Sequence, residues 1–211
     1  MEERDMGRWA RFSLDSTNRN ATIRAVSRTE IALLGYALLG LLHQKPASGY
    51  DLRKIFTETP MAGYSNSPGA IYPALRRLEE QKLVRGSIEA ASGLRQRKVF
   101  RVTPAGMTAL KKWLTSPFDQ EDVAKRLNEL MLRFAFLDQV VGEAATLRFL
   151  QSFEAALNLY VPTLRGFLKE HGASMPASGR LALENGTLGY EAQLEWASRA
   201  IDFYKNRENT R

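Results

Sequence analysis

The spacing of apolar residues changes twice along this chain, and each change marks a different kind of element. Over Glu30–His43 apolar residues fall on nearly every side of a helix, which predicts a helix at the centre of a core. Thr29 is its candidate N-cap, and Pro46 forces a break after it. Ser48 is a second candidate N-cap and predicts a short helix over Gly49–Glu58.

A third helix is predicted after the turn-forming stretch TPMAGYSNS. Ser67 followed by Pro68 has the chemistry of an N-cap and a first helical position, and we expect the helix to reach about Lys82. Helical spacing places Ile71, Ala74, Leu75 and Leu78 on one face, Gly69, Pro73, Arg76 and Glu80 on the opposite face, and Tyr72 and Arg77 on the flanks.

The period then becomes two, as in β-strands. Residues 83–89 and 97–102 alternate in this way, and the segment between them is small and flexible at its start and basic at its end. This pattern predicts a β-hairpin with a protruding tip. Thr103 with Pro104 starts another helix, which is expected to reach about Thr115.

Three long helices are predicted in the rest of the chain. Their expected spans are 121–141, 142–170 and 181–206, and Pro162 is expected to kink the second of them. The segment 171–179 is rich in small residues and is expected to be a linker. This half of the chain has no strand pattern and no internal repeat.

The excess of basic over acidic residues in the chain is confined to its middle segment. The whole chain carries a net charge of +7, and residues 31–116 alone hold 13 basic and 5 acidic side chains. Residues 117–211 hold 11 basic and 13 acidic side chains. A compact basic module beside a slightly acidic one suggests that the first binds a polyanion and that the second has another task.

Several classes of protein are disfavoured by what the sequence lacks. There is no cysteine, which excludes disulfides and thiol nucleophiles and fits a reducing cytoplasm. His43 and His171 lie far apart without neighbouring ligands, so we expect no metal site. No nucleophile elbow, phosphate-binding glycine loop or paired carboxylates occur, so we expect neither a cofactor nor an enzyme. The apolar run Ile31–Leu42 has 12 residues, too few for a membrane-spanning helix, which needs about 20.

Basic residues gather on the two elements that could reach DNA together. A helix fits the major groove, which is about 12 Å wide, and a hairpin beside it reaches the neighbouring backbone or minor groove. Arginine and lysine supply donors on both elements, hydroxyl and amide groups also bind phosphate, and a helix N-terminus favours an anion. We therefore expect the DNA-contacting residues to be Asn66, Ser67, Gly69, Tyr72, Pro73, Arg76, Arg77, Arg95, Gln96, Arg97 and Lys98.

Two other interpretations of this module are open at this point. Arg76, Arg77 and Lys82 could form a solvated face that pairs with Glu79 and Glu80 on the same helix. The module could also serve protein contact alone, without specific reading of DNA. An acidic or neutral hairpin would have favoured that alternative, and here the hairpin is basic.

Three stretches of the chain resemble the PadR family of transcriptional regulators: ALLGYALLGLLHQKPASGYDLRK, SPGAIYPALRRLEEQKLVRG and RKVFRVTPAGMTALKKWL. The resemblance covers residues 31–115, and the SGYDL and IYPALRRLE blocks make it specific. It implies a mainly α fold, in which a winged helix-turn-helix DNA-binding domain with a small β-hairpin wing is followed by an all-α dimerisation domain. It also implies a cytoplasmic, nucleoid-associated homodimer that represses transcription at an inverted-repeat operator.

The resemblance also assigns parts to individual positions. Tyr72 matches a tyrosine placed to meet phosphate, residues 93–98 match the wing, and Lys82 stands where members of the family often have glycine. On this basis we expect three segments along the chain: a flexible leader over 1–28, a DNA-binding domain over 29–116, and a dimerisation domain that could also hold an effector over 117–211.

The aromatic residues of the last three predicted helices have two interpretations. Most of them suit helix packing and a dimer core. The alternative is an effector cavity, since some members of the family respond to small phenolic or aromatic compounds and others to planar drugs. The expected partners are therefore double-stranded DNA, a second copy of the chain and an aromatic small-molecule effector. Such a ligand loosens DNA binding only if it favours a dimer whose half-site spacing no longer fits.

Overall fold

The computed structural model describes residues 31–64, 68–90 and 96–208. The chain divides into two units after Ala32, and all the described helices and strands belong to the unit Leu33–Arg211. The expected leader 1–28 and the candidate cap Thr29 lie outside the described residues.

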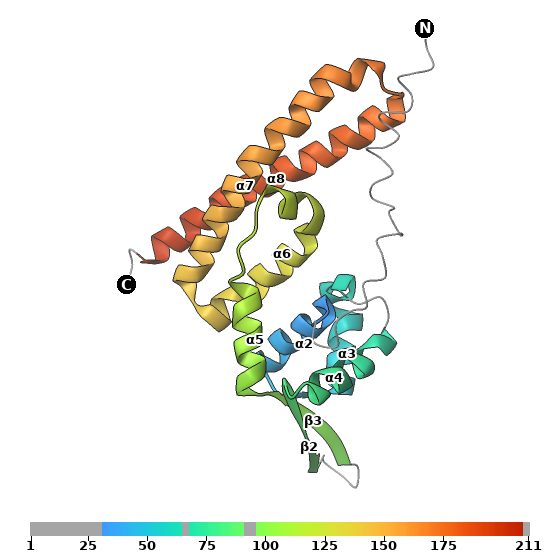
Figure 1. The fold of residues 1–211 in the computed structure, drawn as a ribbon, viewed down its shortest axis with the longest axis vertical. Coiled ribbons are helices and arrows are strands. Elements are labelled where there is room, and N and C mark those ends of the chain that lie inside the picture. The colour runs from blue at the N-terminus through green and yellow to red at the C-terminus, as the bar shows by residue number, and fades with distance from the viewer. Residues whose placement is uncertain (1–30, 65–67, 91–95, 209–211) are drawn as a thin grey trace. The chain divides into compact units, whose positions relative to one another are not determined.

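The first part of this unit is a winged helix-turn-helix (Figure 1). Its central helix, Leu33–Gln44, packs against the helices Ile71–Glu80 and Pro104–Leu114 and the strand Gln96–Val102. Leu38 and Leu39 in this helix are completely buried, as the sequence predicted for a helix that is apolar on nearly every side. The helices are α2 (Leu33–Gln44), α3 (Gly49–Glu58), α4 (Ile71–Glu80) and α5 (Pro104–Leu114), the strands are β1 (Ala47–Ser48), β2 (Val84–Ala90) and β3 (Gln96–Val102), and 3-10 turns lie at Pro60–Tyr64 and Pro68–Ala70.

Two helices begin at N-caps that the sequence predicted. Ser48 Oγ accepts a hydrogen bond from the backbone N–H of Asp51, and the Asp51 carboxylate accepts one from the N–H of Ser48, so α3 begins with a capping box. At the start of α5, Thr103 Oγ1 accepts a hydrogen bond from the N–H of Gly106, with Pro104 in the first turn. Local side-chain chemistry therefore sets where both helices start.

Helix α4 begins later than predicted. Residues 68–70 form a 3-10 turn, and the α-helix starts at Ile71. Ala70 precedes it without a side-chain cap, and Ser67, the predicted cap, lies outside the described residues. The first turn is thus wound more tightly than an α-helix, which is common at helix N-termini.

The other end of α4 closes around Lys82 in a left-handed conformation. The helix stops at Glu80, and Lys82 has φ of 60°. The N–H of Leu83 donates to Leu78 O at 2.8 Å, and the N–H of Lys82 donates to Glu79 O at 2.9 Å, which together form a Schellman C-cap. Glycine is preferred at this position because it has no Cβ to strain the backbone. Since the left-handed Lys82 lies beyond the last helical residue, Glu80, the predicted end at Lys82 was too late.

The wing is part of a three-stranded antiparallel sheet with strand order β1-β3-β2. The hairpin predicted from the alternating pattern is present, and Val84 pairs with Val102 at its base while Ala90 pairs with Gln96 near its tip. Strand β1 was not predicted, because two residues are too few to show an alternating pattern. It pairs Ala47 with Phe100 and so attaches the start of α3 to the wing.

Three long helices follow: α6 (Gln120–Val141), α7 (Glu143–His171) and α8 (Ala177–Glu208). Gly142, with φ of 100°, joins α6 to α7, and α7 and α8 run side by side (Figure 1). The prediction of a linker over 171–179 was wrong in extent, since residues 172–174 are a 3-10 turn and α8 already begins at Ala177. Packing of α8 along α7 stabilises helix where composition alone favours a loop.

Helix α6 packs directly against the winged helix. The rings of Tyr36 in α2 and Trp113 in α5 are stacked with centroids 4.3 Å apart, and Trp113 Nε1 donates to Glu129 of α6 at 3.2 Å. Gly40 of α2 lies so close to Phe136 of α6 that a Cβ there would be 2.6 Å from the ring. Residues 33–211 therefore form one compact unit, and the domain boundary expected at 116–117 stays a prediction.

Candidate nucleic-acid interface

Helix α4 buries one face and exposes the other, as its pattern predicted. Its four buried side chains are those assigned inward, and the exposed ones include Tyr72, whose relative exposure is 52%, with Arg76 and Arg77. Gly69 and Pro73, two further predicted contacts, are exposed and half-buried respectively near the same end of the helix. The outward face of α4 is therefore polar and accessible.

The two arginines of α4 do not pair with the acids of their own helix. Within the described part of the chain, neither Arg76 nor Arg77 forms an ion pair, and Glu79 pairs with Lys98 of the wing instead. The solvated face of paired charges considered for this helix is thus not what the structure contains. Two guanidinium groups with unused donors are available for an external anion.

Tyr72 is oriented by the close approach of two helices. A Cβ on Gly49, the first residue of α3, would lie 2.6 Å from Cε1 of Tyr72. Glycine is therefore required there for the ring to pack on the start of α3. About half of the tyrosine surface stays accessible, so a ring held by the fold presents its remaining surface outward.

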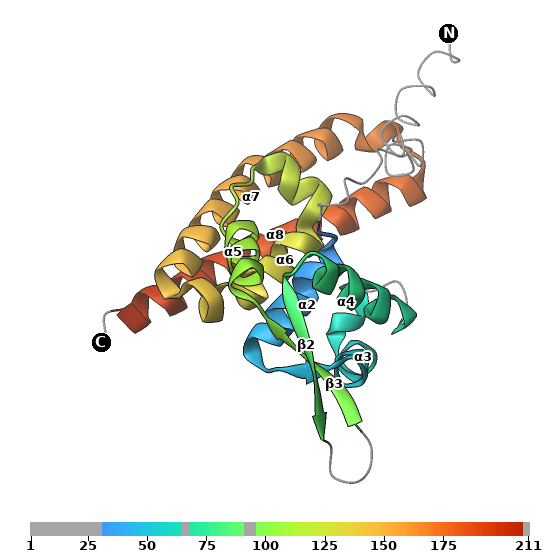
Figure 2. The same ribbon diagram turned by 60° about the horizontal axis from the view of Figure 1, so that its bottom comes forward.

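The cations of the wing are exposed but partly engaged. Gln96, Arg97 and Lys98 are all exposed on β3, which Figure 2 shows projecting from the body of the winged helix together with β2. Lys98 Nζ lies 2.7 Å from Glu79 Oε2, whereas Arg97 Nη1 is 3.8 Å from Asp51 Oδ2. The second contact is loose and solvent-exposed, so it contributes little and leaves Arg97 available.

Two acids beside the interface are held in their charged form. The pKa of Asp51 is lowered chiefly by its hydrogen bond from the Ser48 hydroxyl. The pKa of Glu79 is lowered chiefly by its hydrogen bond from Lys98, with a further contribution from the Gly86 N–H. Both carboxylates are therefore structural acceptors within the winged helix.

The structure adds two exposed residues that the sequence reasoning did not select. Tyr50 in α3 is 61% exposed, and the guanidinium of Arg53 lies 5.7 Å from the centroid of its ring. They are three positions apart and so share a face of the first helix of the helix-turn-helix, the one that crosses the DNA backbone in this motif. Their i, i+3 spacing on the polar side of α3 was the available signal.

The predicted contacts fall into three groups. Tyr72, Arg76, Arg77, Gln96 and Arg97 are exposed on α4 and the wing of one winged helix. Gly69 is exposed just before α4, Pro73 is half-buried in its first turn, and Lys98 is exposed but paired with Glu79. Asn66, Ser67 and Arg95 lie outside the described residues.

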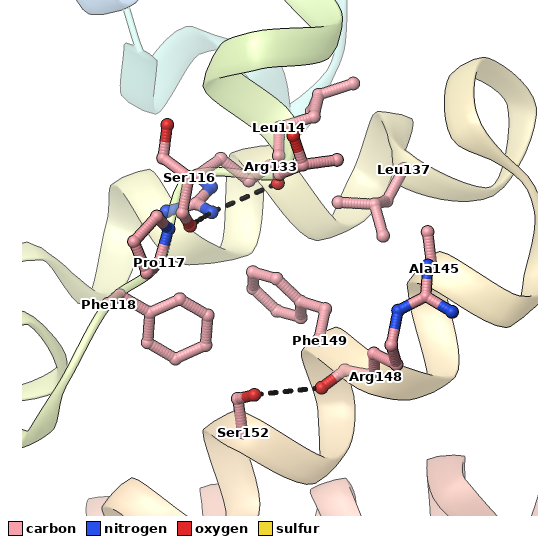
Figure 3. Close-up of a pocket in the computed structure, with 11 residues that line it drawn as sticks. Leu114, Ser116, Pro117, Phe118, Arg133, Leu137, Ala145, Arg148, Phe149 and Ser152 are labelled. Atoms are coloured by element: carbon pink, nitrogen blue, oxygen red, sulfur yellow. Dashed lines mark hydrogen bonds between the residues drawn. The ribbon is translucent and has the colours of Figure 1, made fainter.

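A second candidate site lies where the winged helix meets the long helices (Figure 3). A cavity of about 200 Å³ is lined by the end of α5, the segment after it, α6 and α7. Arg133 is 3% exposed in its wall, and its guanidinium carbon lies 5.3 and 5.5 Å from the ring centroids of Phe118 and Phe149. Arg148 and Ser152 of α7 line the same cavity.

Arg133 is buried with part of its hydrogen-bonding capacity unused. Its Nη2 donates to Leu114 O at 3.0 Å and to Ser116 O, so it caps the end of α5. Its Nε is buried and has no hydrogen-bond partner among the described residues. Burial lowers the pKa of Arg133, but an arginine stays charged at neutral pH. A cation beside two neighbouring rings thus lies in the wall of a small cavity.

Among the described residues no group of three or more histidine, cysteine, aspartate or glutamate side chains could hold a metal ion. In the same part of the chain no helix has the length and apolar character needed to span a bilayer.

Comparison with known proteins points to one family. The model of the transcriptional regulator PadR-like family matches residues 38–112. The negative transcriptional regulator PadR of Bacillus subtilis is 28% identical over 114 residues, which make up 54% of this chain and 62% of that protein. The transcriptional regulator Rv3488 of Mycobacterium tuberculosis is 48% identical over 72 residues, 34% of this chain and 66% of that protein. Both matches span less than two thirds of the relative's length.

Solved structures of the same family are also similar to this chain. The crystal structure of Bacillus subtilis PadR in complex with operator DNA matches with a TM-score of 0.41 and 20% identity, and the match covers 83% of this chain and 99% of that one. The structure of the same protein in complex with p-coumaric acid matches with a TM-score of 0.37 and 20% identity, over 82% of this chain and 96% of that one.

Proposed function

Because the chain belongs to the PadR-like family of transcriptional regulators, we propose that it represses transcription by binding duplex DNA through α4 and the wing. In this proposal α4 lies in the major groove, and the wing contacts the adjacent backbone or minor groove. The observation that carries it is the pair Arg76 and Arg77, exposed on the outward face of α4 without a protein partner among the described residues. Such a regulator acts on the chromosome in the cytoplasm.

The contacts divide by chemistry into base readers, which bind base edges, and anchors, which bind phosphates. Arg76 and Arg77 have the planar donors that bind guanine bidentately, and they are the proposed base readers. Tyr72 on α4 and Arg97 on the wing are proposed phosphate contacts, with Tyr50 and Arg53 of α3 on the neighbouring backbone. Anchors contribute similar affinity for every sequence, whereas loss of a reader relaxes specificity.

Fragments of genomic DNA retained by the full chain would supply the operator. Arg76→Ala and Tyr72→Ala should then weaken operator binding while helicity and oligomer mass stay unchanged, by about 1–3 kcal/mol for a base-contacting arginine. Arg199→Ala is the matched control, because Arg199 is an exposed arginine on α8. Variants at both positions that bind as tightly as wild type would refute the assignment.

A salt titration separates this function from a module for protein contact alone. Each phosphate neutralised lowers the slope of log affinity against log salt by about 0.9. A chain that prefers no duplex at low salt would favour the protein-contact alternative.

The chain is proposed to act as a homodimer on an inverted repeat. Large apolar side chains are exposed on the two C-terminal helices, among them Leu159 of α7 at 63% and Leu188 of α8 at 59%. Dimers with this motif bind half-sites about 34–36 Å apart, so the second copy that covers these side chains has to present its own α4 at that separation. Sedimentation of wild type and Leu188→Asp tests this proposal, because the charged side chain should shift the protein toward monomer.

The cavity beside Arg133 is proposed to hold an aromatic effector with a negative charge. Phe118 and Phe149 provide ring contacts, and the unpartnered Nε of Arg133 with Arg148 provides donors for a carboxylate. p-Coumaric acid, the ligand of the Bacillus subtilis relative, is a suitable probe. Calorimetry should detect binding to wild type and weaker binding to Arg148→Met, and release of operator DNA by the acid would show unequal affinity for two states.

A further inference from the structure

One carboxylate holds both strands of the wing against α4. Oε1 of Glu79 accepts a hydrogen bond from the N–H of Gly86 in β2 at 3.2 Å, and Oε2 accepts one from Lys98 Nζ in β3 at 2.7 Å. Glu79 lies on α4, three residues after Arg76 and two after Arg77. The helix that carries the proposed base readers is therefore attached directly to the wing.

Gly86 provides the space in which Lys98 lies. A Cβ on Gly86 would be 2.1 Å from Cε of Lys98 and 2.8 Å from Oε1 of Glu79. Gly86 pairs with Phe100 across the hairpin, and Lys98 Nζ lies 5.2 Å from the centroid of the Phe100 ring. The lysine thus lies across the glycine and along the ring, with its ammonium directed to Glu79, instead of extending away from the wing.

We propose that Glu79, Gly86 and Lys98 form a clamp that sets the position of the wing relative to α4, and that tight operator binding depends on it. The proposal rests on the proposed function. In it Lys98 is a positioning residue for the wing and does not neutralise a phosphate. Groups on α4 and on the wing bind one duplex together, so holding their separation in the free protein lowers the ordering cost of binding.

For Glu79→Gln, the clamp and simple electrostatic attraction predict opposite changes in operator affinity. Glu79→Gln removes a negative charge from a basic module, and electrostatic attraction alone would make DNA binding tighter. Loss of the ion pair with Lys98 should instead weaken operator binding, by about fivefold for a partly exposed pair whose contribution is about 1 kcal/mol. Glu80→Gln is the matched control, because Glu80 is the next residue of α4, is exposed and undergoes the same charge change. It should bind as tightly as wild type or more tightly.

The role of Lys98 is tested by the salt dependence of binding. Lys98→Met should weaken operator binding yet leave the slope of log affinity against log salt unchanged, whereas loss of a phosphate contact reduces the steepness of that negative slope by about 0.9. Arg97→Ala serves as the comparison, since a proposed phosphate contact should show this reduction. The double variant Glu79→Gln/Lys98→Met should bind no more weakly than the weaker single variant, because both changes break one interaction. Lys98→Arg, which keeps a donor, should restore much of the affinity.

The probe is the duplex with the highest affinity among the retained genomic fragments, and thermal unfolding checks that each variant of the full chain is folded. If Glu79→Gln does not fold, the clamp is tested by the salt slope of operator binding by Lys98→Met and by the recovery of affinity in Lys98→Arg. The clamp is refuted if Glu79→Gln binds as tightly as Glu80→Gln, or if Lys98→Met makes the salt slope less steep as Arg97→Ala does. A wild-type chain that retains no duplex overturns the proposed function itself, and the clamp with it.

Discussion

Replacing Lys82 by glycine should stabilise this protein, although it removes a whole side chain. Lys82 is exposed and adopts φ of 60° where the Schellman cap closes α4. A residue with a Cβ is strained in this conformation by about 1–2 kcal/mol. Glycine removes that strain but makes the unfolded chain more flexible, at a cost of about 0.5–1 kcal/mol. The expected net gain is about 0.5–1 kcal/mol.

Thermal and urea unfolding measure this gain. For a chain of this length, each kcal/mol corresponds to an increase in the melting temperature of about 2–4 °C. Lys82→Ala is the control, because it removes the same charge and the same side chain but keeps a Cβ in the left-handed conformation. If alanine stabilises the protein as much as glycine does, the effect comes from charge and the conformational reasoning is wrong.

Three further perturbations test the packing and the caps. Gly40→Ala should destabilise the protein by about 1–2 kcal/mol, because overpacking against the Phe136 ring outweighs the better helix propensity of alanine. In urea unfolding, the double variant Gly40→Ala/Phe136→Leu should recover stability relative to Gly40→Ala. Ser48→Ala removes the N-cap of α3 and should cost about 1 kcal/mol in the same assay; an unchanged midpoint would contradict the capping assignment. Asp51→Asn should lower the free energy of unfolding at pH values above 3.8, the ordinary pKa of the side chain. The difference from wild type should shrink as the pH falls below 3.8. The reason is that the folded state, in which the pKa of Asp51 is lowered, stabilises only the charged form of the carboxylate. Unfolding curves across this pH range would contradict that reasoning if the difference stayed constant.

Several features of the fold follow from short stretches of sequence. The cap at Ser48 and the cap at Thr103 with Pro104 place the starts of α3 and α5, because a side-chain oxygen binds an N–H only two or three residues away. The wing hairpin and the buried face of α4 follow from periods of two and 3.6 residues, which depend on backbone geometry alone. The helical period also placed Arg76 and Arg77 away from the apolar face of α4, which is why they were predicted to contact DNA.

Other features depend on residues far apart in the chain, and no local pattern contains them. The partner of Glu79 is Lys98, 19 positions away, rather than an arginine one turn back on α4. Tyr72 is oriented by the absence of a side chain at Gly49, and the cavity beside Arg133 requires α5, α6 and α7 to meet. Sequence patterns determined which residues are charged, exposed or helical, because those are properties of one segment. Only the tertiary structure decided which charges are engaged and which are available, because the distance between two segments depends on how the whole core packs.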